Sequence, residues 1–117
     1  MNERFANEQL SNEGLQRDQG AALILALIMV LVGALIEARS CERFQLLVGA
    51  LRERGPADLH ALYVELLAAE ARHFRTFVDL AIEASGGDEA GVRARLAELA
   101  AAEGEICARL SSDPTVH

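Results

Sequence analysis

The sequence predicts an all-helical fold, and three observations carry that prediction. Of the 117 residues, 51% are hydrophobic, yet only 4% are aromatic and Trp is absent, so any core must be aliphatic. Ala and Leu, which dominate that apolar share, are among the strongest helix formers. Only two prolines interrupt the chain. A chain this short forms one domain or part of one, which excludes a two-domain enzyme with separate cofactor and substrate modules.

The first third of the chain divides into a polar and an apolar stretch. Residues 1–19 are polar and predict a weak helix or a loose N-terminal arm. Residues 20–36 then run for seventeen positions without a charge, at the lower edge of the roughly 20 residues that span a bilayer. No basic cluster precedes this stretch, and it continues without a break into amphipathic sequence. The sequence therefore favours a helix buried on all sides by protein over a membrane span.

Start and stop signals set the remaining elements. Gly55-Pro56 ends the first long helix at about residue 54. A second helix is predicted over about 57–84, followed by a break at 85–88 whose last residue, Asp88, is suited to cap a third helix. That helix is predicted to run to about residue 110. Residues 111–117 are expected to form a flexible tail.

Charge and cysteine content exclude several functional classes. Eighteen acidic residues against eleven basic ones give a net charge of −7, and all eleven bases are Arg. Non-specific nucleic-acid binding and attraction to anionic lipid both require excess positive charge. Cys41 and Cys107 are 66 residues apart and form neither a disulfide framework nor a zinc ribbon motif. Reduced thiols of a cytoplasmic protein fit this usage best.

Two helical stripes combine apolar residues with ionisable ones. Steps of three and four residues place a single glutamate on the stripe before the turn, and a glutamate and a histidine on the stripe after it. The first stripe comprises Val30, Ala34, Glu37, Cys41, Phe44, Val48 and Leu51. The second comprises Leu59, Leu62, Leu66, Glu70, His73, Phe77 and Leu80.

Folding the hairpin at about residue 56 brings these ionisable groups together. It sets residues 70–73 level with about 39–42, so that Glu37 lies within one turn of the height of Glu70 and His73. A carboxylate on an apolar face is costly unless it is paired or binds a metal. Glu-x-x-His spacing puts both side chains on one helix face. The pattern indicates a metal site, although pairing of the glutamates with arginine and a hydrogen-bonded core histidine explain it too.

Other polar residues are weaker candidates. Glu42 is a rival to Glu37, but its position at the edge of the stripe suits it better to orienting Arg39 or a ligand from outside the site. Tyr63 borders the ligand stripe and is expected either to pack in the core or to hydrogen-bond near the site. Cys41 is expected to act as a small apolar side chain. Three glutamates of the third helix are expected to form a solvated face: Glu98, Glu103 and Glu105.

Three segments resemble one enzyme family: LVGALIEARSCERFQLL, LYVELLAAEARHFRTFVDLA and VRARLAELAAAEGEI. They are similar to the C-terminal part of the tRNA-(2-methylthio-N6-isopentenyladenosine) hydroxylases, with EARSCERF and AEARHF as the specific signals. The resemblance implies that residues 20–110 form a partial ferritin-like bundle. It further implies a non-haem di-iron monooxygenase that uses dioxygen to hydroxylate an isopentenyl group on tRNA. By this resemblance Glu37, Glu70 and His73 are metal ligands, and no catalytic residue beyond them is indicated.

The chain departs from the family pattern at its N-terminus. Residues 1–30 lack the additional Glu and Glu-x-x-His that complete a di-iron set of four Glu and two His. One possibility is an inactive fragment. Another is a homodimer, because two copies of the three ligands supply the full set and two-fold dimers are the commonest oligomers. An iron-oxidising ferritin-like protein without an RNA substrate, or a helical or membrane-anchored module, are the competing functions.

Overall fold

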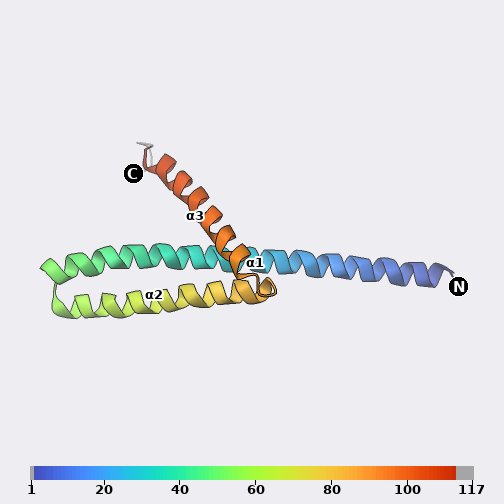
Figure 1. The fold of residues 1–117 in the computed structure, drawn as a ribbon, viewed down its shortest axis with the longest axis horizontal. Coiled ribbons are helices and arrows are strands. Elements are labelled where there is room, and N and C mark those ends of the chain that lie inside the picture. The colour runs from blue at the N-terminus through green and yellow to red at the C-terminus, as the bar shows by residue number, and fades with distance from the viewer. Residues whose placement is uncertain (1, 113–117) are drawn as a thin grey trace.

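The computed structural model describes residues 2–112, and within them the chain is entirely helical. Its elements are α1 (Asn2–Arg54), α2 (Ala57–Ala84) and α3 (Glu89–Ser111). Helices α1 and α2 form a long antiparallel hairpin, from which the N-terminal half of α1 extends alone (Figure 1). The all-α prediction, a long hairpin followed by a third helix, is confirmed. The predicted flexible tail lies outside the described residues beyond residue 112.

The turn between α1 and α2 requires glycine at its first position. The backbone N–H of Gly55 donates to the carbonyl oxygen of Leu51 at 2.8 Å. A Cβ atom at Gly55 would lie 2.9 Å from that same oxygen, closer than a side chain tolerates. Pro56 then adopts an extended conformation (φ −63°, ψ 139°) and precedes the first turn of α2, where its missing N–H costs nothing. The predicted helix stop at Arg54 is confirmed.

The turn between α2 and α3 combines two glycines with a helix cap. Gly86 and Gly87 both have positive φ, 75° and 94°, a conformation that side chains disfavour. The carboxylate of Asp88 then accepts a hydrogen bond from the backbone N–H of Gly91 at 3.0 Å. This is the predicted N-cap, and it sets where α3 begins.

The core is small and lies where all three helices meet. Leu31 of α1, Ala81 of α2 and Val92 of α3 are buried together. From this junction α3 leads away from the hairpin (Figure 1), so that most of its C-terminal half is exposed. Farther along, Arg39 of α1 forms an ion pair with Glu103 of α3, with Nε and Oε2 2.6 Å apart. The hairpin thus has one flank covered by α3.

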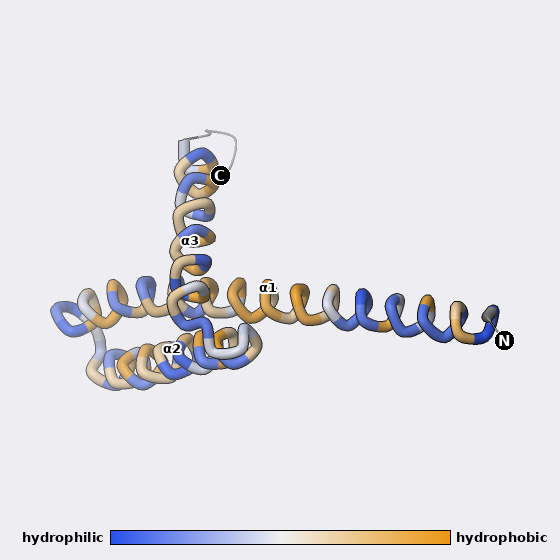
Figure 2. The backbone as a smooth tube through the Cα atoms, turned by 45° about the vertical axis from the view of Figure 1, so that its right-hand side comes forward, coloured by the Kyte–Doolittle hydropathy of each residue, from blue (hydrophilic) through white to orange (hydrophobic). Residues whose placement is uncertain are grey.

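The N-terminal half of α1 agrees with one prediction made for it and differs from another. Residues 2–19 continue α1 as regular helix, which is the first of the two predicted alternatives, a weak helix or a loose arm. Residues 20–26 are apolar but exposed, because α2 ends level with the segment just beyond them. Figure 2 shows this apolar stretch between the polar N-terminal turns and the hairpin. The prediction that residues 20–36 are buried on all sides is therefore wrong for a single chain.

One helix among the described residues is long and apolar enough to cross a membrane by length and composition. It is α1, whose most apolar 18-residue window has a mean hydropathy of 2.7 and is 11% buried. Core helices of soluble proteins, which are mostly buried, and signal sequences near an N-terminus also meet this criterion. Helices α2 and α3 cover only a small part of this window.

Candidate metal centre

The hairpin brings together the three residues that the sequence singles out. Glu37 comes from α1, and Glu70 and His73 come from adjacent turns of α2. One potential ligand atom from each residue lies within 4.8 Å of the others. The Nδ1 atom of His73 is 3.6 Å from Oε2 of Glu70 and 3.9 Å from Oε1 of Glu37. The register deduced from the turn is what makes this cluster possible.

The two carboxyl groups of the cluster are close together and shielded. The side chains of Glu37 and Glu70 are 19% and 23% exposed, whereas His73 is 59% exposed. A hydrogen bond with Glu70 raises the pKa of Glu37, and so do burial and the charge of Glu70, while His73 lowers it. Within residues 2–112, neither carboxylate pairs with an arginine. The two acids therefore repel each other unless a proton or a cation lies between them.

The donor set fits a divalent transition metal. Two carboxylates and one imidazole on two facing helices are half of the ligand set of a ferritin-like di-metal centre. Carboxylate and imidazole donors together suit first-row metals such as iron. A cation bound here would offset the repulsion between the carboxylates of Glu37 and Glu70. One chain offers three residues that could bind a metal. His73 lies on the exposed side of this group.

The neighbours of the cluster are apolar or aromatic. Burial raises the pKa of the Cys41 thiol, and the charges of Glu70 and Glu37 raise it further. Cys41 is thus held as a neutral thiol, which agrees with its predicted role as a small apolar side chain. Tyr63 packs edge-on against Phe44, with ring centroids 5.5 Å apart. Of the two roles predicted for Tyr63, core packing and a hydrogen bond near the site, the structure shows aromatic packing.

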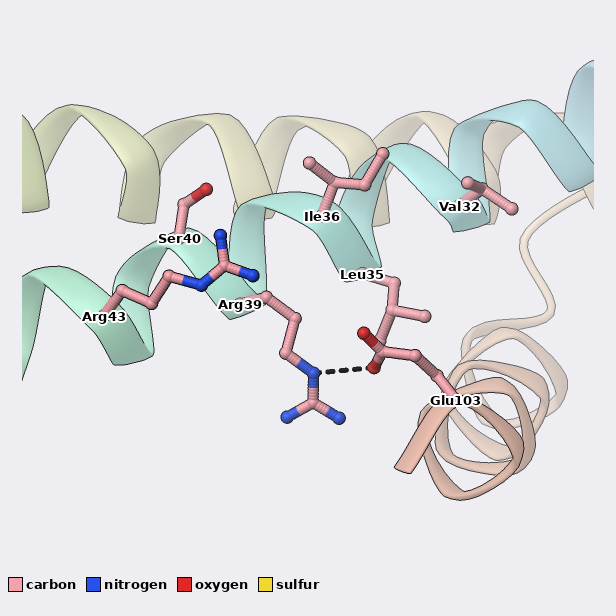
Figure 3. Close-up of a pocket in the computed structure, with 7 residues that line it drawn as sticks. All are labelled: Val32, Leu35, Ile36, Arg39, Ser40, Arg43 and Glu103. Atoms are coloured by element: carbon pink, nitrogen blue, oxygen red, sulfur yellow. Dashed lines mark hydrogen bonds and ion pairs between the residues drawn. The ribbon is translucent and has the colours of Figure 1, made fainter. Parts of the chain in front are cut away.

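Arg39 and Glu42 pair with each other but lie on the flank that α3 covers. The guanidinium of Arg39 donates to both carboxylate oxygens of Glu42, at 2.8 and 2.9 Å, and to Glu103. Figure 3 shows Arg39 extending toward Glu103 of α3, with Ile36 and Ser40 of α1 lining the same pocket. The predicted Arg39–Glu42 contact is present, but it ties α3 to α1. The expectation that Glu103 is solvated is wrong, because its side chain is 31% exposed within this ion pair.

Sequence reasoning missed a second feature, an apolar flank beside the three candidate ligands. A hollow of about 360 Å³ lies on this flank, lined by α1 residues and by Phe77 of α2. Its floor is Gly33, where a Cβ atom would lie 3.1 Å from the Phe77 ring. The signal was available as a second apolar series at helical spacing, Met29, Gly33 and Ile36. It could not be separated from ordinary core without knowing which flank α3 covers.

Comparison with known proteins identifies one matching family. The family model described as tRNA-(MS[2]IO[6]A)-hydroxylase (MiaE) matches residues 9–117. A tRNA 2-(methylsulfanyl)-N(6)-isopentenyladenosine(37) hydroxylase of Pseudomonas putida is 49% identical over 78 residues, 66% of this chain and 35% of that relative. The enzyme of the same name from Salmonella typhimurium is 46% identical over 59 residues, 50% of this chain and 20% of that relative. The matched part thus spans about a third or less of these relatives. No solved structure matches significantly.

Proposed function

Because the chain belongs to the tRNA-(MS[2]IO[6]A)-hydroxylase family, we propose that it provides half of a di-iron centre for hydroxylating the isopentenyl group of a modified tRNA adenosine. The observation that carries the proposal is the cluster of Glu37, Glu70 and His73 within 4.8 Å. Bound iron would supply the activation of dioxygen that hydroxylation of an unactivated carbon requires. Such a reaction on tRNA implies a cytoplasmic protein.

The residues of the chain would each contribute a distinct part of the site. Glu37 and Glu70 would hold the metal through carboxylate oxygens and neutralise its charge, and His73 would hold it through an imidazole nitrogen. Cys41, Phe44 and Phe77 border the site on the same two helices and would exclude water from it. The described residues offer three of the six ligands of such a set, and a second copy would offer the other three.

A second candidate function is iron oxidation without an RNA substrate. The net charge of −7 favours it, because two copies together are still more acidic and tRNA binding depends on neutralising phosphates. The same ligands serve both functions. The two candidates differ only in whether a modified adenosine is hydroxylated.

The decisive measurement is iron content per chain after anaerobic loading, with the mass in solution recorded on the same sample. We expect about one iron per chain, lost in Glu70→Ala and in His73→Ala and kept in Glu105→Ala, whose carboxylate is 78% exposed on α3. Loaded protein is then given tRNA carrying the isopentenyl adenosine and dioxygen. A hydroxylated nucleoside supports the first function, and iron-dependent oxygen uptake without it supports the second. Absence of iron from the wild-type protein contradicts both.

A further inference from the structure

The flank of the hairpin opposite α3 is apolar and contains the exposed side of the ligand cluster. We call it the open flank and define it by residues on both hairpin helices: Met29, Leu47, Leu62, His73 and Leu80. All five are exposed, by 71% for Met29 and 49% for Leu62. Helical spacing places them on one side of the hairpin, while Leu31 and Arg39 on the other side contact α3. The open flank therefore has no partner among the residues that the structure describes.

The total surface of the chain shows that a large area is uncovered. The chain exposes 9089 Å², whereas a compact monomer of 12.6 kDa exposes about 6,200 Å². Its radius of gyration is 21.5 Å, against about 13 Å for a compact domain of this length. A stable dimer buries about 800 Å² or more on each partner. The excess surface is more than sufficient for such an interface.

A membrane is a poor partner for this surface because α2 runs beside the apolar segment of α1. Gly33 touches Phe77, and Leu31 packs with Ala81, so residues 27–36 lie beside the last turns of α2. Those turns carry exposed charges at Arg75, Asp79 and Glu83, which hydrocarbon does not accommodate. Of the apolar segment, only residues 20–26 extend beyond α2, about 10 Å of helix, whereas a bilayer core is about 30 Å thick.

The position of Glu37 along α1 indicates how a second copy would lie. Glu37 is 17 residues after Gly20, where the apolar segment begins, and 17 residues before Arg54, where α1 ends. A two-fold axis at the level of Glu37, perpendicular to the hairpin, therefore sets residue 20 of one copy level with residue 54 of the other. The apolar segment of each copy then lies against the hairpin tip of its partner, and the polar residues 2–19 extend beyond it. A two-fold axis along the hairpin leaves residues 20–26 without such cover.

We propose that two copies associate through their open flanks, with α1 packed antiparallel against α1 of the second copy around a two-fold axis at Glu37. This inference rests on the proposed function for the six-ligand set, and on the apolar open flank independently of it. Each copy contributes Glu37, Glu70 and His73 to one enclosed centre. Met29 of one copy then lies within a turn of Leu47 of the second copy, while the same two residues within one chain are about 27 Å apart.

Disulfide cross-linking tests this arrangement directly. The variant Met29→Cys/Leu47→Cys is made with Cys41→Ser and Cys107→Ala and oxidised in chelator, without iron. We expect its mass on non-reducing gels to shift to twice 12.6 kDa, with no shift for either single variant in the same background. A double variant that stays monomeric, or one that enters phosphatidylcholine vesicles as a monomer, overturns the proposal. Folding of the variant is checked by its helical circular dichroism, and sedimentation of the wild type provides a test that needs no substitution.

The dimer and the proposed function fail in distinguishable ways. A cross-linked or sedimenting dimer that binds no iron supports the docking of the open flanks and contradicts the di-iron proposal. Wild-type protein that binds iron at one per chain yet sediments at 12.6 kDa overturns the dimer and leaves the metal site in place. Because the cross-linking is done in chelator, its outcome does not depend on the metal.

Discussion

The two halves of α1 have similar helical geometry but opposite surroundings. Between Leu31 and Leu51, α2 covers one face, and that face carries Glu37 and the smaller apolar residues around it. Between Gly20 and Ala26, the helix is at least as apolar, yet every residue is exposed. Hydrophobicity alone therefore does not decide which part of α1 is buried. The length of α2 decides it, because α2 has 28 residues and α1 has 53.

This difference separates what one chain can do from what requires a second. The covered half holds three potential ligands in register without further help. The exposed half does not help to align α1 with α2, but it supplies an apolar surface next to the cluster of candidate ligands. The following predictions test whether the two halves differ in stability, in association and in proton binding.

The largest difference is expected in stability. Leu31 is 3% exposed at the junction of the three helices, so Leu31→Ala leaves a cavity and should lower the free energy of unfolding by about 2–4 kcal/mol. Leu15 is 57% exposed in the N-terminal half of α1, and Leu15→Ala should change the free energy of unfolding by less than about 0.5 kcal/mol. Urea unfolding followed by circular dichroism measures both. Equal effects would show that the two halves are buried alike.

Association should depend on the open flank and not on the polar end of α1. Met29→Glu places a charge on the open flank and is expected to weaken dimerisation at least about tenfold, or about 1.4 kcal/mol. Leu10→Glu is the matched control, because Leu10 is 66% exposed in the polar segment that extends past the partner. Sedimentation equilibrium gives both dissociation constants. Equal weakening by the two substitutions would mean that the contact lies elsewhere on α1.

Local signals in the sequence predicted much of this fold. Gly55-Pro56 and Asp88 each act within a few residues, so the ends of α1 and α2 and the start of α3 could be placed from the sequence. The grouping of the three candidate ligands followed from helical spacing and the position of one turn. Their side chains meet because the hairpin turn sets the register of α2 against α1.

The remaining features depend on how α3 packs, which no local signal sets. Glu103 looks like a surface residue in the sequence, and only the direction of α3 brings it to Arg39. The same direction decides which flank of the hairpin stays open. The exposure of residues 20–26 was missed for a related reason, because an apolar run indicates that a segment will be covered but not whether its own chain covers it.

The pKa of Glu37 predicts a pH dependence confined to the ligand cluster. The folded chain raises this pKa above the ordinary value of 4.5, so the unfolded chain binds fewer protons there and stability falls as pH rises from 4.5 through the raised pKa. Glu37→Gln removes this contribution. In chelator, the wild-type melting temperature should therefore fall relative to Glu37→Gln between pH 4.5 and neutrality. A constant difference between the two proteins would contradict the raised pKa of Glu37, and Glu105→Gln should follow the wild type.

The smallest effect is expected at the ion pair that holds α3. Arg39→Ala removes the bonds to Glu42 and Glu103, and because the Arg39 side chain is 30% exposed, the loss should be about 0.2–1 kcal/mol. Arg95→Ala, which breaks a pair 61% and 65% exposed within α3, is the control and should cost less. Iron content should be unchanged in both, since the guanidinium of Arg39 bonds to Glu42 and Glu103 rather than to the ligand cluster. Loss of iron in Arg39→Ala would instead show that this residue orients the ligands, and that the two flanks of the hairpin are coupled.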